Sequence, residues 1–271
     1  MRRMHGQPAR RAYQAAQWLV RQHLGKRRST PLPASIAPGD LEEAYAVQEA
    51  FCELKAVHCG AVSGHKIALT TPQMRTLVGL DAPVAGRMHA RQLVHGPGRV
   101  RAASYGRLLV EFEIAFRMAA DLPASGGPYD LAAIAGAVGT VMPAFELADD
   151  RGADYSTLSA RGLELAADNA WNEGAVLGAP AADWRALDLA ALRGVAYIDG
   201  RPVGEGLGAD SMGHPLAALQ WVANHLVARR QGLRRGDIVI SGSLVTSKFP
   251  SAGSELRFEV GGLGAVELRV D

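Results

Sequence analysis

The chain has 271 residues, of which 48% are hydrophobic and 21% are charged, and its formal net charge is +2. This composition excludes a disordered or fibrous chain, and the near balance of acidic and basic residues gives no argument for binding nucleic acid. No uncharged apolar run approaches the roughly 18 residues that a membrane helix needs, so we expect no membrane span.

Residues 1–60 are predicted to form a helical N-terminal lobe. Residues 9–25 are rich in Ala, Gln, Leu and Arg, and a proline-containing linker follows them. Asp40 lies three residues before Glu43, a spacing typical of the start of a helix. Gly60 is a natural end for that second helix.

The two cysteines bear on the cellular location. Cys52 and Cys59 lie about two turns apart on the second predicted helix, which is too far for a disulfide. The basic N-terminus lacks the apolar core of a signal peptide, and we interpret it as the first turns of a surface helix. Both features favour a cytoplasmic location.

Residues 61–271 change in texture and are predicted to form one structural unit dominated by strands. Short apolar runs alternate with Gly, Pro and Asp, and residues 110–116 alternate strictly between apolar and other residues. Asp199-Gly200 favours a type I′ turn between two strands. The other predicted elements are helices at 130–138 and 214–231, and strands at 140–147, 194–198, 201–205, 238–241, 256–260 and 265–270. The expected fold class is therefore α+β.

Two glutamates share one face of the strand at 110–116. Glu111 and Glu113 are two residues apart, and the third member of their face is Ala115 rather than a residue suited to water. Like charges on one face repel unless a cation lies between them. Glu146, in another apolar strand, would complete a set of carboxylates suited to Mg²⁺, although a solvated face remains the alternative.

Lys66 lies in the run Gly64-His65-Lys66-Ile67-Ala68-Leu69-Thr70. The glycine and the apolar residues make burial of this lysine plausible, and a buried lysine can act as an acid or base. A surface lysine at the end of a strand is the alternative. His65 would face the opposite way, and we interpret it as structural.

Several motifs, in this order, resemble the 2-keto-4-pentenoate hydratase / 4-oxalocrotonate decarboxylase family of the fumarylacetoacetate-hydrolase-like superfamily. The resemblance covers the chain from about residue 40 to the C-terminus. The motifs are Gly64–Thr70, Val78–Pro83, Val110–Phe116, Pro143–Asp149, Ala167–Ala170, Gly236-Asp237, Ser241–Ser243 and Gly262–Val266.

The resemblance implies a mixed β-roll core of the fumarylacetoacetase C-terminal-like type, carrying a site for Mg²⁺ or Mn²⁺. Glu111, Glu113 and Glu146 match the family's metal-ligand positions. Lys66 matches its lysine near the substrate, and Asp81 is a second catalytic candidate that orients Lys66, binds water or only caps a turn.

The same motifs imply a substrate site and a reaction class. The substrate-binding candidates are Leu69, Asn169, Trp171 and Ser243. The implied substrates are short unsaturated 2-oxo or 2-hydroxydienoic acids from aromatic catabolism, and the implied activity is that of a lyase, through a metal-stabilised dienolate.

Three departures from the family pattern put the substrate in question. Many hydratases carry a second acid where this chain has Val84, and the apolar residue is more similar to the decarboxylase branch. Trp171 stands where a serine is common. Lys248, in a late loop, either contacts a distal carboxylate or is solvated.

The predicted function is a 2-keto-4-pentenoate hydratase-like lyase. The alternatives are a 4-oxalocrotonate (2-oxo-3-hexenedioate) decarboxylase, a C–C bond hydrolase of fumarylacetoacetase type, and a relative that binds ligands without turnover. We expect a homo-oligomer with a small 2-oxo acid as substrate. A hetero-complex with a pathway enzyme is a further hypothesis.

Overall fold

The computed structural model describes residues 7–271, so the first six residues of the predicted surface helix lie outside it. The helices are α1 (Gln7–Leu24), α2 (Leu41–Cys59), α3 (Pro72–Val78), α4 (Leu131–Ala137), α5 (Gly162–Ala167) and α6 (Pro215–Ala228). Short 3₁₀ turns include η1 (Ala90–Gln92), η4 (Tyr155–Ala160) and η5 (Asn169–Trp171). Among the described residues, no helix combines the length and the apolar character needed to cross a membrane.

In residues 7–271, thirteen strands form two sheets, and eight of them belong to the larger one. Its order is β2-β1-β10-β5-β6-β7-β3, with β11 paired to part of β5. The bounds are β1 (Val62–Ala68), β2 (Val84–His89), β3 (Leu93–His95), β5 (Leu108–Met118), β6 (Val138–Asp149), β7 (Asn172–Leu177), β10 (Ile238–Ile240) and β11 (Val245–Lys248).

The smaller sheet has the order β4-β13-β12-β8-β9. Its strands are β4 (Gly98–Val100), β8 (Arg193–Ile198), β9 (Arg201–Leu207), β12 (Glu255–Val260) and β13 (Gly264–Val270). Asp199 and Gly200 join β8 to β9 with φ angles of 51° and 74°, the left-handed pair that a type I′ turn needs. The fold is thus the predicted mixture of helices and mixed sheets.

The main core lies where the two sheets pack against each other. Phe112 on β5 contacts Phe145 on β6 at a centroid distance of 5.5 Å and Phe258 on β12 at 5.6 Å, both edge to face. All three rings are fully buried. Such rings contribute large apolar areas and favourable edge-to-face contacts, so they fix the spacing of the sheets.

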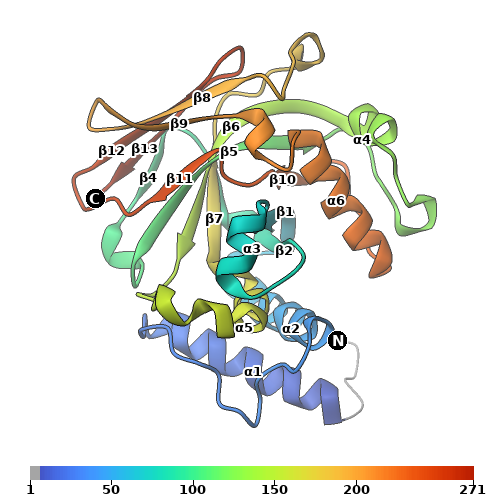
Figure 1. The fold of residues 1–271 in the computed structure, drawn as a ribbon, viewed down its shortest axis with the longest axis vertical. Coiled ribbons are helices and arrows are strands. Elements are labelled where there is room, and N and C mark those ends of the chain that lie inside the picture. The colour runs from blue at the N-terminus through green and yellow to red at the C-terminus, as the bar shows by residue number, and fades with distance from the viewer. Residues whose placement is uncertain (1–6) are drawn as a thin grey trace.

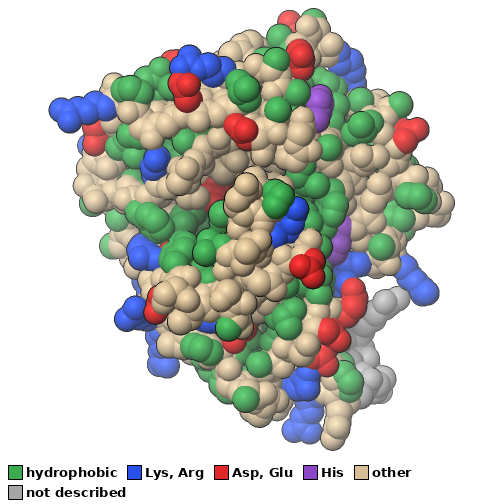
Figure 2. Space-filling model, viewed as in Figure 1, with side chains coloured by type: hydrophobic (Ala, Val, Ile, Leu, Met, Phe, Trp, Pro, Cys, Tyr) green, Lys and Arg blue, Asp and Glu red, His purple; other side chains and the backbone are tan. Residues whose placement is uncertain are grey.

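The N-terminal helices make a second cluster at the other end of the large sheet. Figure 1 shows α1 and α2 together with α5 below the sheets, while α3 lies in front of the large sheet. Asp40 caps α2 by accepting a hydrogen bond from the Glu43 backbone N–H at 2.8 Å, and Gly60 ends the helix at φ 83°, as predicted. In Figure 2 basic and acidic side chains are interspersed, and the surface is hollowed beside α3 with acidic atoms inside the hollow.

Two differences from the sequence prediction concern helices. The helix predicted at 214–231 ends at Ala228, three residues before the predicted end. Arg230 then adopts a left-handed φ of 58°. The chain also forms α3 and α5, helices of 7 and 6 residues that were not predicted. A helix this short carries too few apolar positions for its periodicity to stand out.

Candidate metal and substrate site

The structure brings Glu111, Glu113 and Glu146 together. Glu111 and Glu113 project from one face of β5, and Glu146 on β6 pairs directly across from Glu111. Each offers an oxygen, and these oxygens all lie within 4.8 Å of one another. The neighbouring position Ala115 is fully buried, as are Glu113 and Glu146, so this face is not a solvated one.

The negative charges of these glutamates are not balanced by the side chains around them. Burial raises the pKa of Glu113 well above its usual value, and the charges of Glu146 and Glu111 raise it further. Burial also raises the pKa of Glu146, although Lys66 opposes that change. Glu113 Oε1 and Glu146 Oε2 are buried without a hydrogen-bond partner among the described residues. Three carboxylates and one ammonium leave two negative charges, which one divalent ion bound by carboxylate oxygens would balance.

Lys66 lies on β1, with its Nζ 3.1 Å from Glu146 Oε1. Only 3% of its side chain is exposed. Gly86 on β2 lies directly opposite, and a Cβ there would come within 2.8 Å of Lys66 Cγ, so glycine makes room for the lysine. Burial lowers the pKa of Lys66, but the three glutamates outweigh burial and raise it. The ammonium form is therefore the one present beside these carboxylates at neutral pH.

The segment Asp168–Glu173 forms another wall of the site. Asn169, Ala170 and Trp171 have φ angles of 54°, 46° and 62°, all left-handed. Each such residue costs roughly 1–2 kcal/mol, so the surroundings must hold the turn. The Asn169 side chain accepts from the Arg87 backbone N–H at 2.7 Å and donates to its carbonyl at 2.8 Å. Asn172 Nδ2 then donates to Glu146 Oε1 at 2.8 Å.

The loop around Gly242 completes the frame of the glutamates. The Gly242 backbone N–H donates to Glu113 Oε2 at 2.7 Å. Its φ is 94°, and a Cβ would lie 2.5 Å from Thr70 Cγ2, so this position requires glycine. Ser247 on β11 donates its hydroxyl to Glu111 Oε1 at 2.8 Å. Each glutamate therefore has one oxygen oriented by a hydrogen bond.

The other predicted site residues are placed less uniformly. Leu69 is buried at the end of β1 with a left-handed φ of 61°. The Ser243 hydroxyl accepts from the Phe112 N–H and donates to the Val245 carbonyl, so it connects β5 to β11. Asp81 is exposed on the bend between α3 and β2, and its side chain makes no hydrogen bond with the described residues. Its catalytic role stays a prediction.

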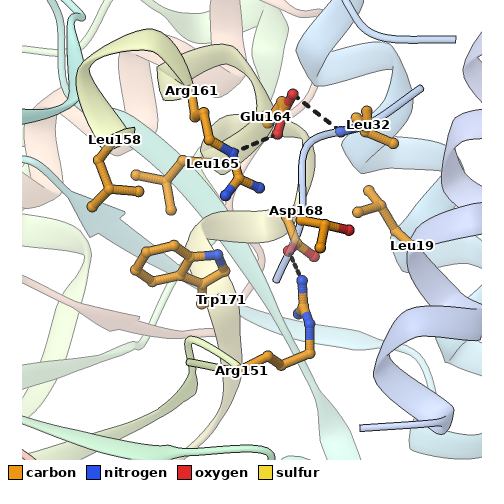
Figure 3. Close-up of a pocket in the computed structure, with 10 residues that line it drawn as sticks. Leu19, Leu32, Arg151, Leu158, Arg161, Glu164, Leu165, Asp168 and Trp171 are labelled. Atoms are coloured by element: carbon orange, nitrogen blue, oxygen red, sulfur yellow. Dashed lines mark hydrogen bonds and ion pairs between the residues drawn. The ribbon is translucent and has the colours of Figure 1, made fainter. Parts of the chain in front are cut away.

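Trp171 lines a cavity between α5 and the chain that joins α1 to α2. Figure 3 shows its indole beside Leu158 and Leu165, with the Arg151–Asp168 ion pair nearby. The indole also lies 6.2 Å from the Tyr155 ring, centroid to centroid. The structure thus gives this tryptophan apolar neighbours where the resemblance predicts a substrate contact.

Four groups that support the site were not among the predicted site residues: Gly86, Asn172, the Gly242 N–H and Ser247. Asn172 was the easiest of these to recognise, because it is a polar residue two positions before the apolar run Gly174–Leu177. Gly86 acts through the absence of a side chain and Gly242 through its backbone N–H, while Ser247 lies on a strand of only four residues. None of these leaves a residue pattern that points to a site.

Comparison with known proteins gives consistent results. Residues 74–271 match the family described as fumarylacetoacetate (FAA) hydrolase C-terminal. A 2-keto-4-pentenoate hydratase of Burkholderia vietnamiensis is 32% identical over 241 residues, 89% of this chain and 90% of that protein. A 2-oxo-hept-4-ene-1,7-dioate hydratase of Escherichia coli is 28% identical over 232 residues, which are 84% of this chain and 86% of that protein.

A solved structure shares the fold over nearly the whole chain. It is the 4-oxalocrotonate decarboxylase of Pseudomonas putida G7, complexed with magnesium and adipate. The TM-score is 0.87 at 23% identity, over 97% of this chain and 98% of that one.

Proposed function

Because the chain belongs to the fumarylacetoacetate (FAA) hydrolase C-terminal family, we propose that it is a divalent-metal-dependent lyase acting on small unsaturated 2-oxo or 2-hydroxydienoic acids, as a 2-keto-4-pentenoate hydratase. The observation that carries the proposal is the glutamate triad, of which Glu113 and Glu146 are fully buried and each have one unpartnered oxygen, together with the nearby Lys66. Hard carboxylate oxygens favour Mg²⁺ or Mn²⁺. The hydratase names of the relatives at 28–32% identity supply the reaction class.

The residues of the chain divide the work of such a reaction. Glu111, Glu113 and Glu146 would hold the ion, and Asn172 and Ser247 orient two of them. A bound divalent ion supplies Lewis-acid stabilisation for negative charge that develops on the oxygens of a 2-oxo acid. Lys66 Nζ carries a proton and lies 3.1 Å from Glu146 Oε1, so it is suited to deliver that proton to a substrate bound beside the glutamates.

One observation favours 4-oxalocrotonate-type decarboxylation as a second candidate. Val84 pairs with Ala68, and Gly86 with Lys66, so Val84 lies on the lysine's face of the sheet. Val84 is fully buried, and no carboxylate stands there to activate water. A reaction that releases carbon dioxide needs the same electron sink but no such base.

A direct assay tests both candidates. 2-Hydroxypenta-2,4-dienoate and 2-oxo-3-hexenedioate would each be supplied with Mg²⁺ or with EDTA, while ultraviolet absorbance and carbon dioxide are followed. Mg²⁺-dependent loss of the dienol supports the hydratase, and Mg²⁺-dependent carbon dioxide from the diacid supports the decarboxylase. E113Q is the control. Absence of both reactions, despite bound metal, would contradict the proposal.

The remaining expectations concern the surroundings of the enzyme. The cytoplasmic location, self-association and a hetero-complex with a pathway enzyme all stay predictions. Gel filtration with light scattering, alone and after co-purification, measures the last two.

A further inference from the structure

A buried cluster of charged side chains lies between α1 and the segment Asp168–Glu173, apart from the glutamate triad. At its centre is His23, near the C-terminal end of α1, with a side chain that is 10% exposed. Its Nε2 lies 2.6 Å from Asp168 Oδ1, and its Nδ1 lies 2.8 Å from Glu173 Oε1. One imidazole from the first helix therefore bridges both ends of this six-residue segment.

Both ring nitrogens of His23 must carry hydrogen for these contacts to be hydrogen bonds. Asp168 also accepts from Arg151 Nη2 at 2.7 Å, and Glu173 accepts from Lys55 Nζ at 2.8 Å. Carboxylates paired with such cations are ionised, and an ionised carboxylate only accepts. An imidazolium at His23 would donate to both carboxylates, whereas a neutral ring could donate to only one of them.

The elements packed around His23 carry further charged and aromatic groups. α2 contributes Lys55, whose ammonium pairs with Glu173, and the ring of Phe51, whose centroid is 5.1 Å from that of the imidazole. Arg151 follows β6, and its Nη1 lies against His23 Nε2. Burial lowers the pKa of His23, and Arg151 also lowers it, but Asp168 and Glu173 outweigh both and raise it above 6.5.

The pKa values of Asp168 and Glu173 agree with a positive charge on His23. Burial raises the pKa of Asp168, yet Arg151 and His23 outweigh burial and lower it. Burial likewise raises the pKa of Glu173, and Lys55 with His23 lowers it to about 2. Asp149, which accepts from the backbone N–H groups of Gly106, Arg107 and Arg151, supplies a third negative charge. Three cations thus face three carboxylates.

The segment that His23 bridges carries strained and functional groups between its ends. Its three left-handed residues persist only because their surroundings hold them. Asn172, one residue before Glu173, donates to the glutamate oxygen that also contacts Lys66. Figure 3 shows Asp168 paired with Arg151 at the base of the same turn, close to Trp171.

We propose that His23 is a positioning residue of the site: its imidazolium holds Asp168 and Glu173 and thereby fixes Asn172 against Glu146. The N-terminal helix thus reaches the metal ligands through one charged side chain. Only the activity readout of this proposal rests on the proposed function. Mg²⁺ binding and the protonation state of the ring test it independently.

The protonation state is measured by NMR on protein labelled with [¹⁵N]histidine, using H23Q to assign the ring signals. We expect His23 to be doubly protonated at pH 6.5 and to lose its proton only at higher pH. H58Q, which changes an exposed histidine of α2, should leave these signals unchanged. A neutral His23 ring at pH 6.5 would overturn the proposal.

The effect of His23 on the glutamate site is measured by Mg²⁺ calorimetry and by pH–rate profiles. We expect H23Q to weaken Mg²⁺ binding by about tenfold, as for other residues that orient a ligand, and H58Q to leave it unchanged. The wild-type kcat should fall as the pH rises through the His23 pKa, and this alkaline limb should be absent in H23Q. Wild-type Mg²⁺ affinity in a folded H23Q variant would refute the positioning role.

Two further outcomes keep this proposal separate from the proposed function. If the wild type turns over neither substrate but H23Q still loses Mg²⁺ affinity, the positioning role stands and the proposed function fails. If H23Q does not fold, E173Q replaces it, since that variant keeps the His23–Asp168 contact. E173Q should lower the His23 pKa and weaken Mg²⁺ binding, and an unchanged affinity would again count against the role.

Discussion

The two faces of β5 behave in opposite ways, although they alternate along one strand. Phe112 and its neighbours on one face are buried among other apolar side chains between the sheets. Glu111 and Glu113 on the other face meet a third carboxylate and a lysine. Burial of the first face stabilises the fold, whereas burial of unbalanced charge on the second destabilises it until a cation binds.

This difference shows how a stable sheet can carry an unstable site. The phenylalanine face holds β5 and β6 in register, and that register places Glu111 opposite Glu146. The glutamates, for which we propose a role in metal binding, do not contribute to the stability of the metal-free protein. Substitutions on the two faces should therefore separate stability from activity.

The largest effect is expected from F112A. Removing a buried phenylalanine in the core costs about 3–5 kcal/mol of unfolding free energy. Urea denaturation of F112A and of F249A measures the contrast, since residue Phe249 is 48% exposed. A loss below about 1 kcal/mol for F112A would mean that this face does not hold the sheets together.

E113Q, unlike F112A, should lower activity without lowering stability. We expect kcat/KM to fall at least about a hundredfold, close to 3 kcal/mol of transition-state stabilisation, because a metal ligand is lost. The unfolding free energy without metal should stay level or rise, since one buried charge disappears. Steady-state kinetics and urea denaturation in EDTA check both halves, and a large loss of stability would contradict the assignment.

Mg²⁺ should stabilise the wild type by mass action. At a free concentration one hundred times Kd the gain is about 2.7 kcal/mol. Thermal melts with Mg²⁺ and with EDTA measure it, with E113Q as the control that should respond weakly. An equal shift in both proteins would place the bound Mg²⁺ elsewhere.

The metal-free protein should also lose stability as the pH rises. The pKa values of Glu113 and Glu146 are raised in the folded state by burial and neighbouring carboxylates. Such groups favour folding below their unfolded value of about 4.5, and this contribution is lost as the pH rises through the folded values. Urea denaturation in EDTA from pH 4.5 upward should show the decline, and saturating Mg²⁺ should remove it.

The smallest expected difference is between substitutions of Ser247 and Lys248, which are adjacent on β11. S247A removes the hydroxyl that orients Glu111 and should weaken Mg²⁺ binding about tenfold. Lys248 has no ion-pair partner among the described residues, so K248A should change stability by less than about 0.5 kcal/mol and leave Mg²⁺ affinity unchanged. Calorimetry on both variants tests the pair, and equal affinities would contradict it.

The sequence predicts much of this fold because long alternating strands and a marked turn leave clear patterns. Residues 110–116 and Asp199-Gly200 are such cases, and the structure confirms both elements. The spacing of Glu111 and Glu113 also shows that they share a face. Their proximity to Glu146 and Lys66 is different, because it depends on which strands are neighbours, and spacing along the chain does not encode that.

The buried charge cluster at His23 was beyond sequence reasoning for a related reason. His23, Lys55, Arg151, Asp168 and Glu173 come from five separate elements, and each alone is typical of an ordinary surface residue. Only packing removes them from water and makes their mutual charge compensation visible. The cavity at Trp171 is equally a product of packing.

The position of β10 in the large sheet has a consequence for how the protein is made. β10 lies between β1 and β5, so Lys66 and the first two glutamates are separated by a strand formed by residues 238–240. A nascent chain that has emerged only as far as β9 contains all four charged residues but lacks the strand that sets their distance. The site is therefore assembled only after residues 238–240 have emerged, by contacts between residues that are far apart in the chain.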